Sequence, residues 1–82
     1  MNKVLVQIYI PTLSEEYDLF LPINKKIVNI IYLIQKALID INPDYKIDNN
    51  IGLYDRITGN KIDVDIKIKD SNIRNGSKLM LV

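Results

Sequence analysis

The sequence contains no cysteine and no histidine. Without cysteine it can form no disulfide, no zinc-thiolate site and no thiol nucleophile. Without histidine it lacks the side chain that most often acts as a general base or metal ligand near neutral pH. Ser14, Ser71 and Ser77 have no base beside them in the sequence and are typical of turns and caps. We therefore expect no catalytic residue, no cofactor and no enzymatic activity.

Glycines and metal-binding patterns are also scarce. The three glycines are scattered, so no phosphate-cradling loop is formed. Three loop aspartates span an EF-hand length, but Asn49 stands where that loop needs glycine and Asp55 where it needs a bidentate glutamate. Asp63 and Asp65 share one face of an extended segment, and two lysines continue that face, which is typical of a mixed-charge edge that resists aggregation. We expect no bound metal.

The chain also lacks a strong charge of one sign and a long apolar run. Its formal net charge is +1, and residues of both signs are interspersed, so no global field attracts nucleic acid or an anionic membrane surface. No apolar run approaches the roughly 18 residues that suggest a membrane-spanning helix, and no secretory signal pattern is present at the N-terminus. We expect a cytoplasmic protein without nucleic-acid partners and without direct membrane insertion.

Apolar side chains are abundant. Hydrophobic residues make up 48% of the 82 positions, and about one residue in five is isoleucine. A chain of this length buries only about 60 to 65% of the surface that its unfolded form exposes, which is enough for one compact core. We therefore expect one domain that spans residues 1–82.

Two alternations of apolar residues near the N-terminus indicate strands. The first ends at Pro11 and consists of Val4, Val6, Ile8 and Ile10. The second ends at Pro22, which lacks a backbone N–H donor, and consists of Tyr17, Leu19 and Leu21. Turn-forming and charged residues lie between them, so the two strands form a predicted hairpin.

A helix follows this hairpin. From Lys26 to Ile41 the apolar residues recur at spacings of three and four, which is the stripe of an amphipathic helix. The stripe consists of Ile27, Ile30, Ile31, Ile34, Leu38 and Ile41. Asn42 and Pro43 end the helix, and residues 42–50 have little periodicity, which indicates a surface loop.

A third strand is predicted after that loop. It contains Ile51 and Leu53, and we extend it to Ile57. Residues 58–60 read Thr-Gly-Asn, and glycine and asparagine tolerate the positive φ of a tight turn.

The remaining residues predict the end of the sheet. Apolar and charged residues alternate over residues 62–68, as in a short fourth strand or an extended segment. Asn-Gly at 75–76 turns the chain into a last strand, where Leu79 and Leu81 face inward. A helix at about residues 26–41 between hairpins covers one face of a mixed sheet. The predicted fold class is therefore α+β, with a sheet of four to five strands packed on one helix.

Two motifs resemble a known family. Residues 69–82 resemble the closing segment of ubiquitin-like domains, "Leu-x-Asp-x-x-Ile-x-Asn/Asp-Gly-Asp-x-Leu-x-Leu", with Ser77 in place of the usual acidic residue. Residues 17–22, Tyr-Asp-Leu-Phe-Leu-Pro, resemble the second strand of the YukD-like proteins, which accompany type VII secretion systems in Gram-positive bacteria. The resemblance covers nearly the whole chain. It implies a ubiquitin-like β-grasp fold and a cytosolic accessory or regulatory component of a type VII secretion system that acts by binding protein partners.

The C-terminal sequence bears on the alternatives. Ubiquitin-like modifiers and sulfur carriers use a flexible C-terminal Gly-Gly, whereas this sequence ends at Val82 without one. We therefore expect a protein that is not conjugated. A modifier or sulfur carrier stays the first alternative, and a β-grasp adaptor of an unrelated pathway, metabolic or nucleic-acid-binding, stays the second.

Two surfaces are candidates for partner binding. The alternation sends one set of side chains inward: Val4, Val6, Leu19, Leu53, Leu79 and Leu81. It sends a second set to the opposite face: Leu5, Tyr9, Phe20, Tyr54 and Met80. The resemblance implies that this second set is the partner site, because ubiquitin meets its partners through the same sheet face. The alternative is that long side chains such as Gln7 and Lys78 cover the face.

The secondary candidate is a flank of the predicted helix. At 100° per residue, Val28, Tyr32 and Ile39 form an apolar flank beside the core stripe. Either the loop of residues 42–50 folds back over it through Tyr45 and Ile47, or the flank contacts a partner or a second copy in a homodimer.

Overall fold

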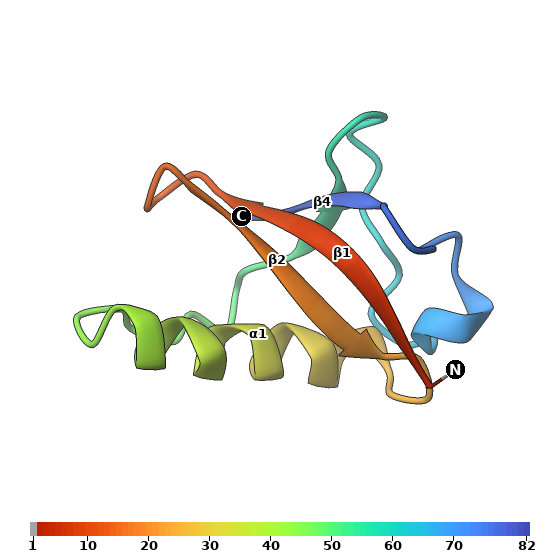
Figure 1. Ribbon diagram of the computed structural model, residues 1–82, viewed down its shortest axis with the longest axis horizontal. Helices are drawn as coiled ribbons and strands as arrows, with labels where there is room; N and C mark the ends of the chain where they lie inside the picture. The colour runs from red at the N-terminus through yellow and green to blue at the C-terminus, as the bar shows by residue number, and fades with distance from the viewer. Residues whose placement is uncertain (1) are drawn as a thin grey trace.

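The structure is a computed structural model that describes residues 2–82. Its elements are β1 (Lys3–Ile10), β2 (Glu15–Pro22), α1 (Ile27–Ile41), β3 (Leu53–Asp55), a one-turn 3-10 helix (Ile68–Asp70) and β4 (Lys78–Leu81). Helix α1 packs on one face of the sheet formed by the strands (Figure 1). This confirms the predicted α+β class. Neither helix within residues 2–82 combines the length and the apolar character that crossing a bilayer requires.

The four strands have the order β2-β1-β4-β3. β1 pairs antiparallel with β2 and parallel with β4, and β4 pairs antiparallel with β3. The sheet is therefore mixed, as predicted, and β2 and β3 form its two edges. A parallel pair needs a long crossover, which α1 and the segments after it provide between β1 and β4.

β1 and β2 form the predicted hairpin. β1 ends with its predicted alternation at Ile10, whereas β2 begins two residues before the predicted start at Tyr17. Its register runs from Lys3 opposite Pro22 to Ile10 opposite Glu15. Ser14, in the turn, has a φ of 52°, in the left-handed region. The two glutamates that start β2 join the strand because an edge strand leaves their carboxylates in water.

Helix α1 begins without a side-chain cap. Its first N–H donors are instead satisfied by an extended segment: Ile27 N–H donates to the carbonyl of Ile66 at 2.9 Å and Val28 N–H to that of Val64 at 3.0 Å. At the other end, Asn42 N–H donates to the carbonyl of Leu38 at 2.7 Å. The free N–H groups of a first helical turn need such partners, so residues 62–68 hold the start of α1.

Residues 62–68 form the extended alternative and not a fourth strand. Lys61 and Lys67 make only isolated bridges, to Tyr54 and Lys26 respectively. The apolar residues of the segment pack half-buried against the core, namely Ile62, Val64 and Ile66. The next residues turn into the 3-10 helix, where the Ser71 hydroxyl donates to the Ile68 carbonyl at 2.6 Å.

The predicted third strand is too long at both ends, because Ile51 precedes the first residue of β3, Leu53, and Ile57 follows its last. β3 ends at Asp55, whose Oδ1 accepts the N–H groups of Ile57 at 2.8 Å and Thr58 at 3.1 Å and so turns the chain. Gly59 completes the predicted turn with a φ of 77°. The Ile57 side chain is 78% exposed at the tip of this turn.

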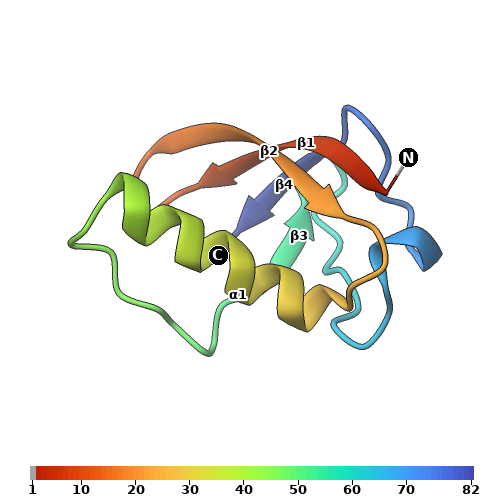
Figure 2. The ribbon, with the colours of Figure 1, turned by 60° about the horizontal axis from the view of Figure 1, so that its bottom comes forward.

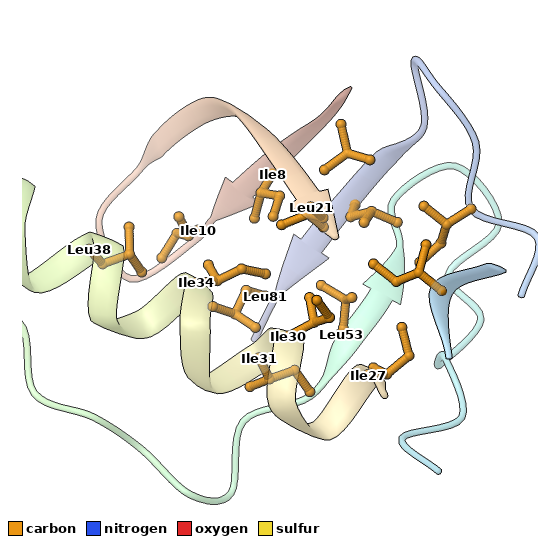
Figure 3. Close-up of a cluster of buried hydrophobic side chains, with 14 residues drawn as sticks. Ile8, Ile10, Leu21, Ile27, Ile30, Ile31, Ile34, Leu38, Leu53 and Leu81 are labelled. Atoms are coloured by element: carbon orange, nitrogen blue, oxygen red, sulfur yellow. The ribbon is translucent and has the colours of Figure 1, made fainter. Parts of the chain in front are cut away.

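One apolar cluster lies between α1 and the sheet (Figure 3). All of the buried apolar residues belong to it: Val6, Ile8, Ile10, Leu21, Ile27, Ile30, Ile31, Ile34, Leu38, Leu53, Ile68, Ile73, Leu79 and Leu81. Val4 and Leu19, which also face inward, are only half-buried. For Leu19 the reason is that β2 is an edge strand of the sheet within residues 2–82.

Candidate functional site

The strand register places the five predicted partner residues on the face of the sheet opposite α1. Leu5 lies opposite Phe20, and Met80 lies between Tyr9 and Tyr54 across β1, β4 and β3. Paired residues share a face, so these are two separate groups on one surface. We call them the Leu5–Phe20 pair and the Tyr9–Met80–Tyr54 row.

A polar row separates the two groups. Gln7 lies between Asp18 on β2 and Lys78 on β4, in the register between the apolar groups. The predicted surface is therefore not one continuous patch. Exposure differs as well, since Leu5 is 39% exposed and Phe20 61%, whereas the three residues of the other row are half-buried.

Arg56 covers part of the Tyr9–Met80–Tyr54 row. Its guanidinium carbon lies 4.4 Å from the centroid of the Tyr9 ring. Its Nη1 donates to Oε1 of Glu16 at 2.6 Å. An ion pair this exposed contributes about 0 to 1 kcal/mol, and the stacked cation about 0.5 to 1 kcal/mol. These weak contacts favour the position of the Arg56 guanidinium over the Tyr9 ring but do not fix it there.

Sequence reasoning missed this role of Arg56. It named Gln7 and Lys78 as possible covers of the face, but the cover over Tyr9 comes from the residue after β3. Arg56 and Glu16 are 40 positions apart, and only the strand order brings them across the same face. No local pattern could have identified the pair.

Gly52 shapes the far end of this row. A Cβ at position 52 would lie 3.2 Å from both Cε1 of Tyr54 and Cε of Lys61. That spacing is tighter than ordinary van der Waals contact, so the Tyr54 ring and the lysine stem occupy the space that a side chain would take. The half-burial of Tyr54 follows from this packing.

The helix flank is only partly covered. Val28 is 49% exposed and Tyr32 51%, whereas Ile39 is half-buried. The Nζ of Lys36 lies 5.9 Å from the centroid of the Tyr32 ring. The loop of residues 42–50 does fold back toward α1, as one of the two alternatives expected (Figure 2). It leaves Val28 and Tyr32 as one wall of a shallow groove, with Ile47 on the other.

The loop is held by Gln35, a residue that sequence reasoning did not single out. Gln35 is 2% exposed on α1. Its Oε1 accepts hydrogen bonds from the Tyr45 hydroxyl at 2.7 Å and the Asp48 N–H at 2.8 Å, and its Nε2 donates to the Asp48 carbonyl at 3.1 Å. A polar residue inside an apolar helical stripe was the available signal, because such a residue needs buried partners.

The Tyr45 hydroxyl gives this contact a pH dependence. Burial raises the pKa of Tyr45 above its ordinary value of 10.0, and the negative charge of Asp48 raises it further. Between the unfolded and the folded pKa the folded state binds more protons, so the free energy of unfolding falls as pH rises through that window. Below pH 10 the protonated Tyr45 hydroxyl makes its full contribution to the free energy of unfolding.

We therefore expect the stability advantage of the parent over Tyr45→Phe to shrink at alkaline pH. Thermal melts of both proteins from about pH 8 to about pH 11 measure the difference in Tm; the comparison cancels the titration of all other groups, which the two proteins share. A difference that stays constant across this range would show that the hydroxyl does not titrate in contact with Gln35 and Asp48.

The acidic candidates do not form a metal site in the part of the chain that the structure describes. No group of three acidic side chains within residues 2–82 is close enough to hold a metal ion. Asp63 instead uses its Oδ1 to accept the N–H of Asp65 at 2.9 Å, and Asp48 accepts that of Asn50 at 2.8 Å. These carboxylates shape turns.

No protein-family model and no curated protein matches the sequence. Solved structures do match its fold. The ubiquitin-like domain of the type VII secretion protein ECCD1 of Mycobacterium tuberculosis is 21% identical, with a TM-score of 0.74 over 100% of this chain and 99% of that one. An ESX-5 inner membrane complex contains a chain that is 10% identical, with a TM-score of 0.72; the match covers 100% of this chain and 21% of that one.

A component of toluene 4-monooxygenase is also similar, at 8% identity and a TM-score of 0.80 over 98% of this chain and 96% of that one. The chain therefore has a ubiquitin-like β-grasp fold, as the sequence motifs implied. Structures with this fold include type VII secretion components and an oxygenase subunit, so function has to be argued from the surface and not from the fold.

Proposed function

We propose that this chain is a protein-binding module that docks onto its partner through the outer face of the sheet. The observation that carries the proposal is the Leu5–Phe20 pair, two large apolar side chains that lie directly opposite each other and are 39% and 61% exposed. Adjacent exposed apolar groups are characteristic of interfaces, and aromatic residues are enriched at their centres. The Leu5–Phe20 pair is the anchor in this proposal.

The Tyr9–Met80–Tyr54 row supplies a second contact. Its side chains are half-buried already, so they offer a preformed surface with little conformational entropy to lose on binding. Arg56, held over Tyr9 by Glu16, adds donors at the edge of this contact. Arginine, tyrosine and methionine are residue types that interfaces favour.

The biological setting that we propose is a type VII secretion system, with this chain as a cytoplasmic accessory or regulatory component that is not conjugated. Two observations support it. The Tyr-Asp-Leu-Phe-Leu-Pro motif of β2 resembles that of YukD-like proteins, and the fold matches the ECCD1 domain over nearly the whole of both chains. Binding in place of catalysis is consistent with a sequence that has no histidine and no cysteine.

The test is a pair of surface variants. Leu5→Ser and Phe20→Ser each remove an exposed apolar side chain from outside the core, so their melting temperatures should stay within about 5 °C of the parent. Binding to the purified cytoplasmic domains of type VII secretion proteins from the same organism should fall at least tenfold, because central apolar anchors contribute about 2 kcal/mol or more. Isothermal titration calorimetry measures the dissociation constant of each variant.

Lys36→Ser and Asp40→Ser on the polar face of α1 are the matched controls and should bind as the parent does. Folded Leu5→Ser and Phe20→Ser proteins with unchanged affinity would contradict the proposed surface. The alternative class, a transferred modifier, would show as adducts of higher mass when extracts are probed for an N-terminally tagged full-length protein.

A further inference from the structure

Strand β2 has an unpaired edge. The N–H of Leu5 donates to Oδ1 of Asn75 at 2.8 Å and its carbonyl accepts the N–H of Gly76 at 2.8 Å, both on the β4 side. Its antiparallel partner, Phe20, is therefore in a pair without mutual hydrogen bonds and directs its own N–H and C=O away from β1. By the same alternation, Glu16 and Asp18 also direct theirs outward.

These groups have no other partner in the part of the chain that is described. Within residues 2–82, no hydrogen bond outside the β1–β2 ladder involves the N–H groups of Glu16, Asp18 or Phe20. An edge of this kind is a template for one more strand. Such a strand would form its hydrogen bonds with every second residue of β2, namely Glu16, Asp18 and Phe20.

An apolar groove runs beside this edge. β2 forms the margin of the sheet on the side of α1 (Figure 2). The groove lies between β2 and α1. Its lining is made of Leu19, Phe20, Leu21, Pro22, Leu33, Ile34 and Ala37. Leu33 is 40% exposed on the α1 side, although its side chain is apolar. A strand added to β2 would direct every second side chain into this groove.

The charge on the edge determines which strand fits. Glu15, Glu16 and Asp18 lie within four residues of β2. Glu16 is paired with Arg56, whereas no ion pair within residues 2–82 involves the other two. In an antiparallel pair of two β2 strands centred on Asp18, the two Asp18 carboxylates would lie directly opposite each other, which is unfavourable. The edge therefore disfavours a second copy and favours a basic strand.

We propose that the β2 edge binds an extended segment of another protein, with apolar residues at alternate positions and Lys or Arg between them. The apolar side chains enter the groove between Leu19 and Leu33. The basic side chains lie on the outer face beside Asp18. The segment adds a fifth strand to the sheet, in the manner of strand addition to an open edge. This site is separate from the Leu5–Phe20 pair except that Phe20 borders both.

The test uses a synthetic peptide of about nine residues that alternates valine and lysine, with a valine–glutamate peptide as the charge control. We expect saturable binding of the first peptide only. In heteronuclear NMR, the amide protons of Glu16, Asp18 and Phe20 should gain protection from exchange, and Leu33 should shift. No binding of either peptide at millimolar concentration, or equal binding of both, would overturn the proposal.

Asp18→Pro provides the variant test. Proline lacks the N–H that points away from β1, and edge strands tolerate proline at such positions. The peptide should bind at least tenfold more weakly. Asp18→Ala, which keeps the N–H and removes only the carboxylate, should weaken peptide binding by a smaller factor than Asp18→Pro. Asp18→Pro that folds and binds within twofold of the parent would overturn the proposal.

Leu33→Lys tests the groove without changing the β2 backbone. It places a cation in the groove, on a side chain that is already 40% exposed, and should weaken peptide binding at least fivefold. Leu5→Ser should leave peptide binding unchanged, which separates this site from the outer-face function. Unchanged binding by Leu33→Lys, or a dimer of the parent in sedimentation that Asp18→Pro dissociates, would overturn the assignment of the edge to a basic peptide.

Discussion

An Ile30→Asp variant is expected to lose its cooperative thermal transition. Ile30 is 0% exposed on the core side of α1, and its buried neighbours in Figure 3 are apolar. A carboxylate there would be buried without a partner, or would have to take up a proton, at a cost of several kcal/mol. A domain of this size has only about 4 to 12 kcal/mol of stability. Circular dichroism during heating measures the outcome.

The matched control is Asn29→Asp, one residue earlier on the same helix. It introduces the same carboxylate at an exposed position in the first turn of α1, where a negative charge is favoured by the helix dipole. This variant should melt cooperatively at or slightly above the temperature of the parent. A cooperative melt of Ile30→Asp within about 5 °C of the parent would show that Ile30 is not in a closely packed core.

Gln35→Leu is expected to have the second largest effect. It removes three hydrogen bonds at once and leaves the Asp48 N–H and carbonyl and the Tyr45 hydroxyl without their protein partner. Unsatisfied, partly buried groups of this kind cost about 1 to 3 kcal/mol each before water reaches them. We expect a net loss of about 2 to 3 kcal/mol, which lowers Tm by roughly 8 to 24 °C.

Hydrogen exchange distinguishes this mechanism from a general weakening of the core. In Gln35→Leu, the Asp48 amide should exchange at least tenfold faster than in the parent, while the amides of β1 change only with global stability. Tyr45→Phe removes one of the three hydrogen bonds and should lower stability by about 1 kcal/mol. If Gln35→Leu were as stable as the parent, the loop of residues 42–50 would not depend on this contact.

Both stability predictions bear on how the molecule presents its surfaces. The core sets the sheet and α1 at a defined spacing, so the groove between β2 and α1 keeps its shape. The Gln35 contact holds the loop that forms the far side of the groove beside Val28 and Tyr32. Surface variants at Leu5, Phe20 or Leu33 leave these contacts untouched, so their effects on binding are separable from effects on folding.

Local pattern was sufficient for the main elements. The three- and four-residue spacing of isoleucine predicted α1 to within one residue at its start and at the correct last residue. Ile41, the last residue of the predicted core stripe, is however 54% exposed, because it lies at the end of the helix. Alternation predicted the hairpin, and the glycines at 59 and 76 do adopt positive φ. These features depend on residues close in sequence: side-chain period decides which face is buried, and the missing Cβ of glycine decides where the chain can turn.

Prediction was least accurate where particular hydrogen bonds, and not the alternation of side chains, decide the backbone conformation. The alternation over residues 62–68 suits a strand or an extended chain equally well. The tertiary structure decides for the extended chain, because its carbonyls accept the first N–H groups of α1. The third strand was predicted to reach Ile57, but the Asp55 carboxylate accepts the Ile57 N–H and turns the chain before that residue.

The sequence by itself determined the fold class, the inward and outward sets of side chains, and the five residues of the outer face. Only the tertiary structure decided that those five residues form two separate groups, the Leu5–Phe20 pair and the Tyr9–Met80–Tyr54 row. Strand order brings Arg56 across to Glu16 over Tyr9 and inserts the polar row through Gln7. It also leaves β2 at an edge beside α1, where Leu33 stays exposed. The physical reason is that these contacts join residues far apart in the chain, and neither side-chain period nor turn chemistry encodes which strands become neighbours.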